Sequence, residues 1–274
     1  SLLATLRSTV NPRITNELKV QHLYTYQLSS PGDQLPNRNI PRAIVENVVS
    51  RINEANRATN IQMGGHRFAQ EGFQNNVLQL INNLYYNTDK AQFTFGVDLM
   101  YTHSRSTFGS EVNGRFHFTN DATGTALENF ERLRPYRYFR EVPLKDDWSV
   151  RGGIWNAGVY GQMATKLARG LDMTVGMRFD YAHFPKATLN QAVLEDLGLR
   201  TDTRLRTFIA QPRLQFTWDV SEQRRDIVRL GAGVFASDIN NYALINNLTF
   251  DGSNLATVDV RGADVPAPNF AAYR

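Results

Sequence analysis

Residues 171–182 alternate strictly between apolar and polar side chains, which is the period of a β-strand. One face of this strand carries Leu171, Met173, Val175, Met177, Phe179 and Tyr181. The other face carries Asp172, Thr174, Gly176, Arg178, Asp180 and Ala182. A strand in a soluble protein usually has about 5–6 residues, whereas a strand that crosses a membrane needs about 9–11. The pattern therefore predicts a strand with lipid on one side and a polar lumen on the other.

The same alternation recurs along the chain. It is clear in residues 14–27, 90–103, 212–220 and 226–236, and weaker from about residue 76, in 154–167 and in the first ten residues. Together with 171–182 these segments predict about eight strands. Aromatic side chains gather near their ends, at Tyr24, Tyr26, Tyr85, Tyr86, Tyr101, Phe179 and Tyr181. They favour the aromatic girdle of a membrane barrel, although ordinary cross-strand packing explains any one of them equally well.

The connections between the strands are of two kinds that alternate along the chain. Short turns rich in Asn, Pro, Gly and Asp occur at 11–16, 87–90, 168–170 and 221–226. Long segments occupy about 28–74, 105–152, 183–205 and everything after 238. This alternation places all short turns at one end, as in outer-membrane barrels with long extracellular loops. The fold class predicted is all-β, a transmembrane antiparallel β-barrel.

One of the long connections contains a helical pattern. After Pro41, the apolar residues Ile44, Val48 and Ile52 recur at helical spacing, and Asn39 could cap the helix. We therefore expect a helix within residues 39–59, inside an extracellular loop.

Composition removes several other classes of protein. The chain has 274 residues, and it contains no stretch near the ~18 consecutive apolar residues that a spanning helix requires. It has no cysteine, which excludes a disulfide scaffold and a thiolate metal site. The net charge of +4 comes without a basic run, so no nucleic-acid partner is expected.

The number of strands permits two kinds of barrel. Eight strands could close a small barrel. However, the chain ends in RGADVPAPNFAAYR, which does not alternate, and the long loops make up a large share of the residues. We therefore expect residues 1–274 to form part of a single, wider outer-membrane barrel domain, with a small closed barrel as the alternative.

Three strands carry loose motifs that follow one another in a defined order. The first has Gly158, Tyr160 and Gln162, the second Gly176, Arg178, Phe179 and Asp180, and the third Pro212, Arg213, Leu214, Phe216, Trp218 and Asp219. In order and spacing these resemble the barrel of TonB-dependent outer-membrane receptors, and most closely the Oar-like and SusC-like group. The chain departs from that pattern at Met163 and Ala164, where the family has an acidic residue followed by Trp or Lys.

The resemblance implies an importer in the outer membrane of a Gram-negative bacterium. It implies a barrel of roughly 22 strands, with a plug and an N-terminal domain before residue 1 and further strands after Arg274. TonB would act through the missing N-terminal part. Lipid bilayer and lipopolysaccharide would surround the wall, and a surface lipoprotein is a further candidate partner. Two other roles stay open, namely a structural or surface-protein-anchoring barrel and a passive porin, with a soluble β-rich binding protein as a residual alternative.

Charged residues on the polar faces of the strands are the first candidate site. A charge facing lipid at mid-membrane costs about 2–4 kcal/mol, so these side chains should face the lumen. The residues are Arg178, Asp180, Arg213, Asp219 and Arg229.

The loop segment 130–143 is the second candidate site, because arginine and aromatic residues are enriched at binding hot spots. The residues proposed for ligand or partner contact are Arg134, Tyr136, Arg137, Tyr138 and Arg140. The alternative is that this loop folds over the barrel mouth and pairs its arginines with lumen acids.

No enzyme motif is present in the sequence. The five histidines, His22, His66, His103, His117 and His183, lie far apart and lack metal-ligand spacing. We therefore expect no catalytic activity, no cofactor and no metal.

Overall fold

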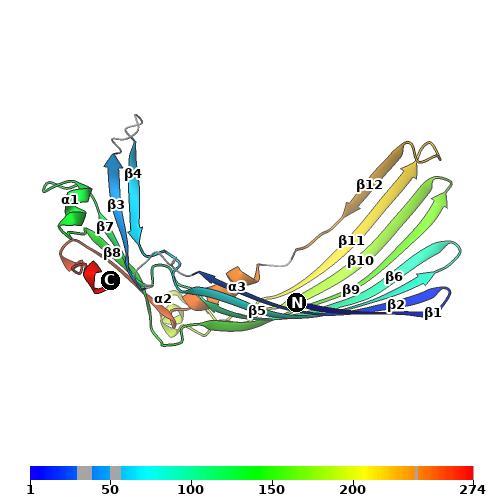
Figure 1. Ribbon diagram of the computed structural model, residues 1–274. Helices are drawn as coiled ribbons and strands as arrows, with labels where there is room; N and C mark the ends of the chain where they lie inside the picture. The colour runs from blue at the N-terminus through cyan, green and yellow to red at the C-terminus, as the bar shows by residue number, and fades with distance from the viewer. Residues whose placement is uncertain (30–38, 50–56, 238–239, 274) are drawn as a thin grey trace.

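A computed structural model describes residues 1–29, 39–49, 57–237 and 240–273. Its largest element is an eight-stranded sheet in the order β1-β2-β5-β6-β9-β10-β11-β12, with every neighbouring pair antiparallel (Figure 1). The strands are β1 (Leu2–Asn11), β2 (Ile14–Ser29), β5 (Glu71–Asn87), β6 (Ala91–Thr107), β9 (Val150–Ala168), β10 (Leu171–His183), β11 (Arg206–Asp219) and β12 (Ile227–Gly233). The central strands have 13 to 19 residues, which is enough to cross a bilayer at a tilt.

All eight predicted strands are confirmed, and so is the alternation of short turns and long connections. The turns contain the residues their geometry needs. In the β1–β2 turn the Asn11 side chain accepts hydrogen bonds from the backbone N–H groups of Arg13 and Ile14, both at 2.9 Å. In the β9–β10 turn Gly170 has φ +72°, and a Cβ there would lie 2.6 Å from the carbonyl oxygen of Asp219. Glycine is therefore required at that turn.

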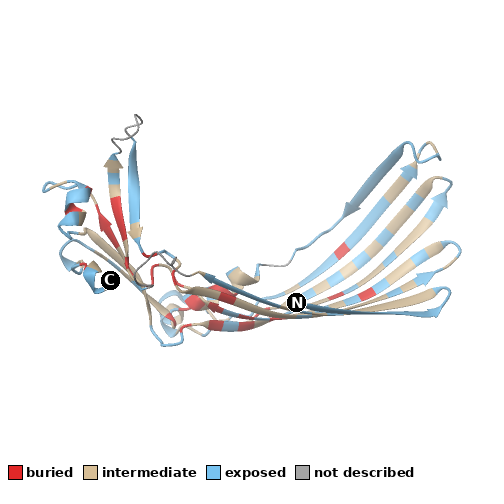
Figure 2. Cartoon of the chain, in the orientation of Figure 1, coloured by how far each residue is buried: buried red, intermediate tan, exposed pale blue. Residues whose placement is uncertain are grey.

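The register of the sheet separates an apolar face from a polar face. Leu80, Leu99, Ala157, Tyr181 and Phe208 lie in one row across five strands, and every second row along the strands continues this face. Its side chains are largely uncovered by protein, and Phe95 and Val159 are each 50% exposed. Figure 2 shows this mixture of exposed and half-buried positions along the strands. In a bilayer, lipid tails would cover these side chains.

The sheet is open within the described residues. Its edge strands are β1 and β12, and neither pairs with the other. Every described residue of β1 and β12 is exposed. The closed eight-stranded barrel is therefore not formed, and the total number of strands in the wall stays a prediction.

The long connections build a second, five-stranded sheet in the order β13-β8-β7-β3-β4. Its strands are β3 (Arg42–Val49), β4 (Ala58–Gly64), β7 (Arg115–Phe118), β8 (Arg137–Pro143) and β13 (Leu255–Arg261). It lies beyond the end of the large sheet where the long connections emerge (Figure 1). Its buried core consists of Ala43, Val45, Phe116, Phe118 and Ala126.

The prediction of a helix within residues 39–59 is wrong, because the described part of this segment forms β3 and the start of β4. Residues 50–56 lie outside the described part. Val45 is fully buried, and β3 pairs in parallel with β7, about 70 residues further along the chain. Parallel pairing with so distant a partner leaves no local signal, and it overrides the helical spacing of Ile44 and Val48.

Short helices complete the connections: α1 (Ala126–Glu131), α2 (Gln191–Leu197) and α3 (Asn241–Asn247), with 3₁₀ turns η1 (Leu248–Phe250), η2 (Gly262–Asp264) and η3 (Phe270–Tyr273). Helix α1 begins with a capping box between Thr125 and Glu128. Among the described residues, no helix has the length and apolar character needed to cross a membrane.

Candidate functional site

The polar face of the large sheet carries a connected set of charged side chains centred on Arg178. Its Nε donates to both carboxylate oxygens of Asp180 at 2.8 and 2.9 Å, and its Nη2 lies 3.4 Å from Asp98. Asp98 also accepts from Gln79 at 2.8 Å, and Asp180 accepts from Gln211. The guanidinium therefore lies between two carboxylates, and each carboxylate also accepts a hydrogen bond from a second donor.

Small and aromatic neighbours hold Arg178 in place. The ring of Tyr160 lies 5.2 Å from its guanidinium carbon, within cation–π range. A Cβ at Gly158 would lie 2.4 Å from Arg178 Nη2 and 2.5 Å from Asp180 Oδ1. Glycine at this position therefore leaves the room in which the ion pair forms.

The three other predicted lumen residues also lie on the polar face. Arg213 donates to Gln211 Oε1 at 3.2 Å and lies 4.8 Å from the centre of the Phe235 ring. Arg229 is exposed and lies opposite Thr217 in the register. Asp219 is at the β11–β12 turn, where it accepts from the Ser221 hydroxyl and the Arg224 N–H. Its contacts stabilise this turn.

A cavity of about 500 Å³ lies on this face. Its polar lining includes Gln79, Asp98, Asn156, Arg178, Asp180 and Gln211. The chain that leaves β12 passes over the same face, because Ala236 N–H donates to Gln211 Oε1 at 3.1 Å. The lining contains cationic, anionic and amide side chains, which together supply hydrogen-bond donors and acceptors. It therefore suits a polar solute or a polar protein segment.

Helix α3 continues this crossing segment and packs onto the polar face at the end nearest the long connections. Ile245 is fully buried against Phe73, Val150, Ile154 and Phe184. The Ser106 hydroxyl donates to Asn246 Oδ1 at 2.5 Å, and Tyr242 donates to Glu71. Residue Ala236 and helix α3, both between β12 and β13, thus lie against the polar face of the sheet. No local pattern in the sequence indicates this arrangement, since the contacts join residues up to 171 positions apart.

Arg137 and Arg140 of segment 130–143 make contacts in and beside the second sheet rather than with lumen acids. Arg137 makes two hydrogen bonds of 2.7 Å to the carboxylate of Asp259 on β13, and this pairing lowers the pKa of Asp259 below its usual value. Arg140 donates to the carbonyl oxygen of Val112 at 2.9 Å. Arg134 is exposed, just after α1.

The two tyrosines of this segment have structural neighbours as well. The ring of Tyr138 packs against Phe116 with centroids 4.7 Å apart. The Tyr136 hydroxyl donates to both oxygens of Glu46 at 3.1 Å. Burial is the first cause of the raised pKa of Tyr136, followed by the charge of Glu46. Four of the five predicted contact residues therefore support the second sheet and its surroundings, and the fifth, Arg134, is exposed at its surface.

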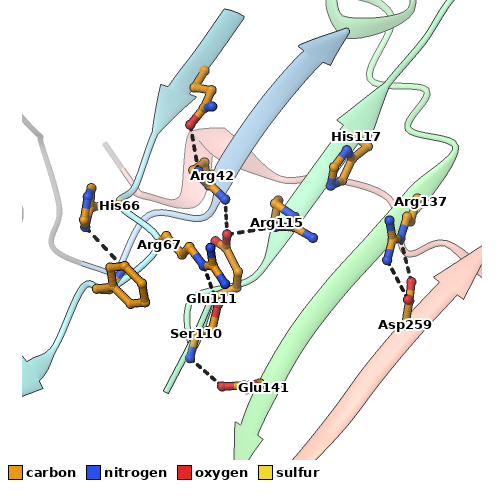
Figure 3. A network of polar contacts seen from close by, with 12 residues as sticks. Arg42, His66, Arg67, Ser110, Glu111, Arg115, His117, Arg137, Glu141 and Asp259 are labelled. Carbon is orange, nitrogen blue, oxygen red and sulfur yellow. Dashed lines mark hydrogen bonds and ion pairs between the residues drawn. The ribbon is translucent and has the colours of Figure 1, made fainter. Parts of the chain in front are cut away.

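A buried carboxylate that the sequence did not reveal holds two strands of this sheet together. Glu111 is 2% exposed and pairs with Arg42 of β3 and with Arg115 of β7, the latter at 3.1 Å (Figure 3). Because β3 and β7 run in parallel with Arg42 opposite Arg115, one carboxylate can bind both guanidinium groups. Burial lowers the pKa of Arg115, while the charge of Glu111 opposes that shift.

His117 of β7 lies on the same face of the second sheet (Figure 3). Its Nδ1 is 2.7 Å from Glu46, and its Nε2 has no partner among the described residues. Burial lowers the pKa of His117 below its usual value, against the opposing hydrogen bond to Glu46. Among the described residues no group of three His, Cys, Asp or Glu side chains could hold a metal ion.

A large sheet with one lipid-compatible face and one charged face, short turns at one end and folded connections at the other defines a membrane β-barrel protein. Residues 2–272 match the family model described as an outer membrane beta barrel domain. The chain therefore belongs to this family and is located in the outer membrane, which overturns the residual alternative of a soluble binding protein. No curated protein and no solved structure matches the chain.

Proposed function

We propose that the chain is a wall section of a TonB-dependent receptor that imports a ligand across the outer membrane of a Gram-negative bacterium. The observation that carries this proposal is that the eight-stranded sheet of the described residues is open, with two unpaired edge strands. Eight strands leave β1 and β12 as separate edges, and lipid does not tolerate unpaired edge groups. Further strands would pair with these edges and close a barrel of about 22 strands.

The polar face supports a wide, filled lumen in this proposal. The Arg178 network and the inward-folded α3 offer polar contacts to a plug that would precede residue 1 and would carry the TonB-contacting segment. The wall itself would perform no bond chemistry.

The first test is the mass of the denatured protein from native outer membranes. A species about three times the 31.1 kDa of this chain, with peptides extending beyond both ends, supports the receptor. A species of 31.1 kDa that spans the membrane alone would overturn it in favour of a small porin-like barrel. Loss of ligand uptake on deleting TonB would then support active import. Ion conductance of the purified protein in planar bilayers would instead support a passive porin.

The second sheet favours a further candidate function, an anchoring barrel. Five strands with their own buried core form a stable platform at the end with the long connections. Such a platform could hold a surface protein or lipoprotein. If deletion of TonB left the role of the protein unchanged while removal of β3–β4 released a surface protein, anchoring would replace import as the function.

A further inference from the structure

The side chains on the apolar face change from apolar to aromatic and then to cationic along β5, β6 and β9, toward the end with the long connections. Figure 1 shows where these three strands lie in the sheet. The row of Leu80, Leu99 and Ala157 is apolar. Two residues further along each strand, Leu78, Tyr101 and Trp155 form a row that is rich in aromatic rings. Four residues beyond that, the row consists of Gln74, Arg105 and Arg151. Apolar, then aromatic, then cationic side chains follow the order of a bilayer from its core to its headgroups.

The aromatic row is packed as an interfacial belt. The rings of Tyr101 and Trp155 lie 4.5 Å apart, and Trp155 is 53% exposed. A Cβ at Gly153 would lie 2.6 Å from the Tyr101 hydroxyl oxygen, so Gly153 gives that ring room to lie along the surface toward the cationic row. The strand register places Arg105 and Arg151 four residues beyond this belt.

The cationic row surrounds a small cavity. Gln74, His103, Arg105 and Arg151 line a space of about 210 Å³. Arg105 and Arg151 lie opposite each other in the register, and Asp147 joins them through Arg105 Nη2 at 3.3 Å and Arg151 Nη2 at 3.2 Å. Their side chains are 45% and 55% exposed.

Donors remain after these contacts are made. Arg105 Nε donates to the Ser149 hydroxyl at 3.0 Å. In the described part of the chain, neither Arg151 Nε nor Arg151 Nη1 has an acceptor. Two guanidinium groups against one carboxylate leave a net positive charge.

We propose that this cluster, defined as Gln74, His103, Arg105 and Arg151, binds a phosphate group of an outer-leaflet glycolipid. Guanidinium groups bind phosphate through paired, charge-assisted hydrogen bonds. The exposed Leu78 and Trp155, four residues nearer the middle of the strands, would contact the acyl chains of the same molecule, which favours a lipid over free phosphate. This site lies on the lipid-facing side of the wall, so it is independent of what the lumen transports.

The test uses the whole protein purified from outer membranes in detergent, with bisphosphorylated lipid A as the probe. Native mass spectrometry counts bound lipid. We expect the wild-type protein to retain one lipid A, and an Arg105→Gln/Arg151→Gln variant to bind it at least about tenfold more weakly. Lipid A without phosphates should bind both proteins equally weakly.

The matched control is Arg169→Gln, which removes an arginine from the β9–β10 turn at the opposite end of the sheet and should leave binding unchanged. Heat-dependent migration on a gel verifies that each variant folds. Asp147→Asn should bind lipid A at least as well as the wild type, because it removes a competing anion. The proposal would be overturned if the double variant bound lipid A as tightly as the wild type. It would also be overturned if inorganic phosphate alone displaced lipid A as well as lipid A itself does. Loss of lipid A binding in Asp147→Asn would likewise overturn it and would indicate a cation site instead.

Discussion

At the scale of single residues, the wall depends on where glycine and charge are placed. Gly158 faces the lumen beside Arg178 and Asp180, whereas Gly161 on the same strand faces lipid beside Phe95. Both glycines have the strand conformation that any residue adopts, so their importance differs only through the space around them.

We predict that Gly158→Ala destabilises the protein by about 1–3 kcal/mol, because its methyl group would occupy the position of the Arg178–Asp180 pair. Gly161→Ala is the matched control, since its Cβ would lie 3.3 Å from Phe95, which can move slightly into lipid. Heat-dependent gel migration gives the midpoint temperature of unfolding for each of the two variants. Equal midpoints would contradict the prediction.

The second residue-scale prediction concerns pH. Because burial lowers the pKa of folded His117, the unfolded chain binds a proton more readily, so the stabilising effect is present above the ordinary pKa of about 6.5 and is lost as pH falls below it. The neighbouring Arg115 acts in the same direction, while Glu46 opposes it.

Limited proteolysis of the second sheet in intact membranes at pH 7.5 and 5.5 checks this effect. Cleavage should accelerate at the lower pH in the wild type and change much less in His117→Gln. A pH dependence that persists in the variant would contradict the assignment to His117. Asp259 would not account for it, because its pKa is lowered from an ordinary value of 3.8 and its carboxylate stays ionised at both pH values.

At the scale of elements, the α3 segment decides how open the mouth of the lumen is. Its anchor is Ile245, and the pairing of Asn246 with Ser106 fixes its orientation. Gly152 leaves room for this anchor, since a Cβ there would lie 2.8 Å from Ile245 Cδ1.

We predict that Ile245→Ala releases α3 from the polar face, because truncating a buried isoleucine typically costs about 2–5 kcal/mol. The chain has no cysteine, so a Ser106→Cys variant reports directly on the surface under α3. A water-soluble maleimide should label the thiol of the Ser106→Cys variant at least about tenfold faster when Ile245→Ala is also present. Leu197→Ala in α2, at a side chain 68% exposed, is the control and should leave the rate unchanged.

At the scale of the whole molecule, the two faces of the sheet contact different solvents. Strand β10 alternates between them at every residue, so neighbouring positions should behave in opposite ways.

We predict that Thr174→Cys reacts with a water-soluble maleimide in intact membranes and that Val175→Cys does not. A lipid-soluble reagent should reverse the preference. Both positions lie within one strand at nearly the same depth, so distance from the membrane surface is controlled. Equal reactivity at both positions would contradict the assignment of the faces.

The large sheet was predictable because alternation is local. Each spanning strand must present lipid and lumen at successive residues, so segments such as 171–182 carry the full signal. The second sheet was not predictable, because β3 pairs with β7 and β8 with β13 across long stretches of chain. The predicted lumen residues lie on the polar face, but the sequence did not indicate that Asp219 would stabilise a turn or that Asp98 would complete the Arg178 network.

The sequence by itself determined the strands, their two faces and their short turns, because the period of two and the turn residues act within a few positions. Only the tertiary structure decided where the long connections go. Glu111 joins Arg42 to Arg115, α3 turns inward onto β6 and β9, and Arg105 meets Arg151 across a strand pair. These contacts unite residues far apart in the chain, and no local pattern constrains which distant residues meet.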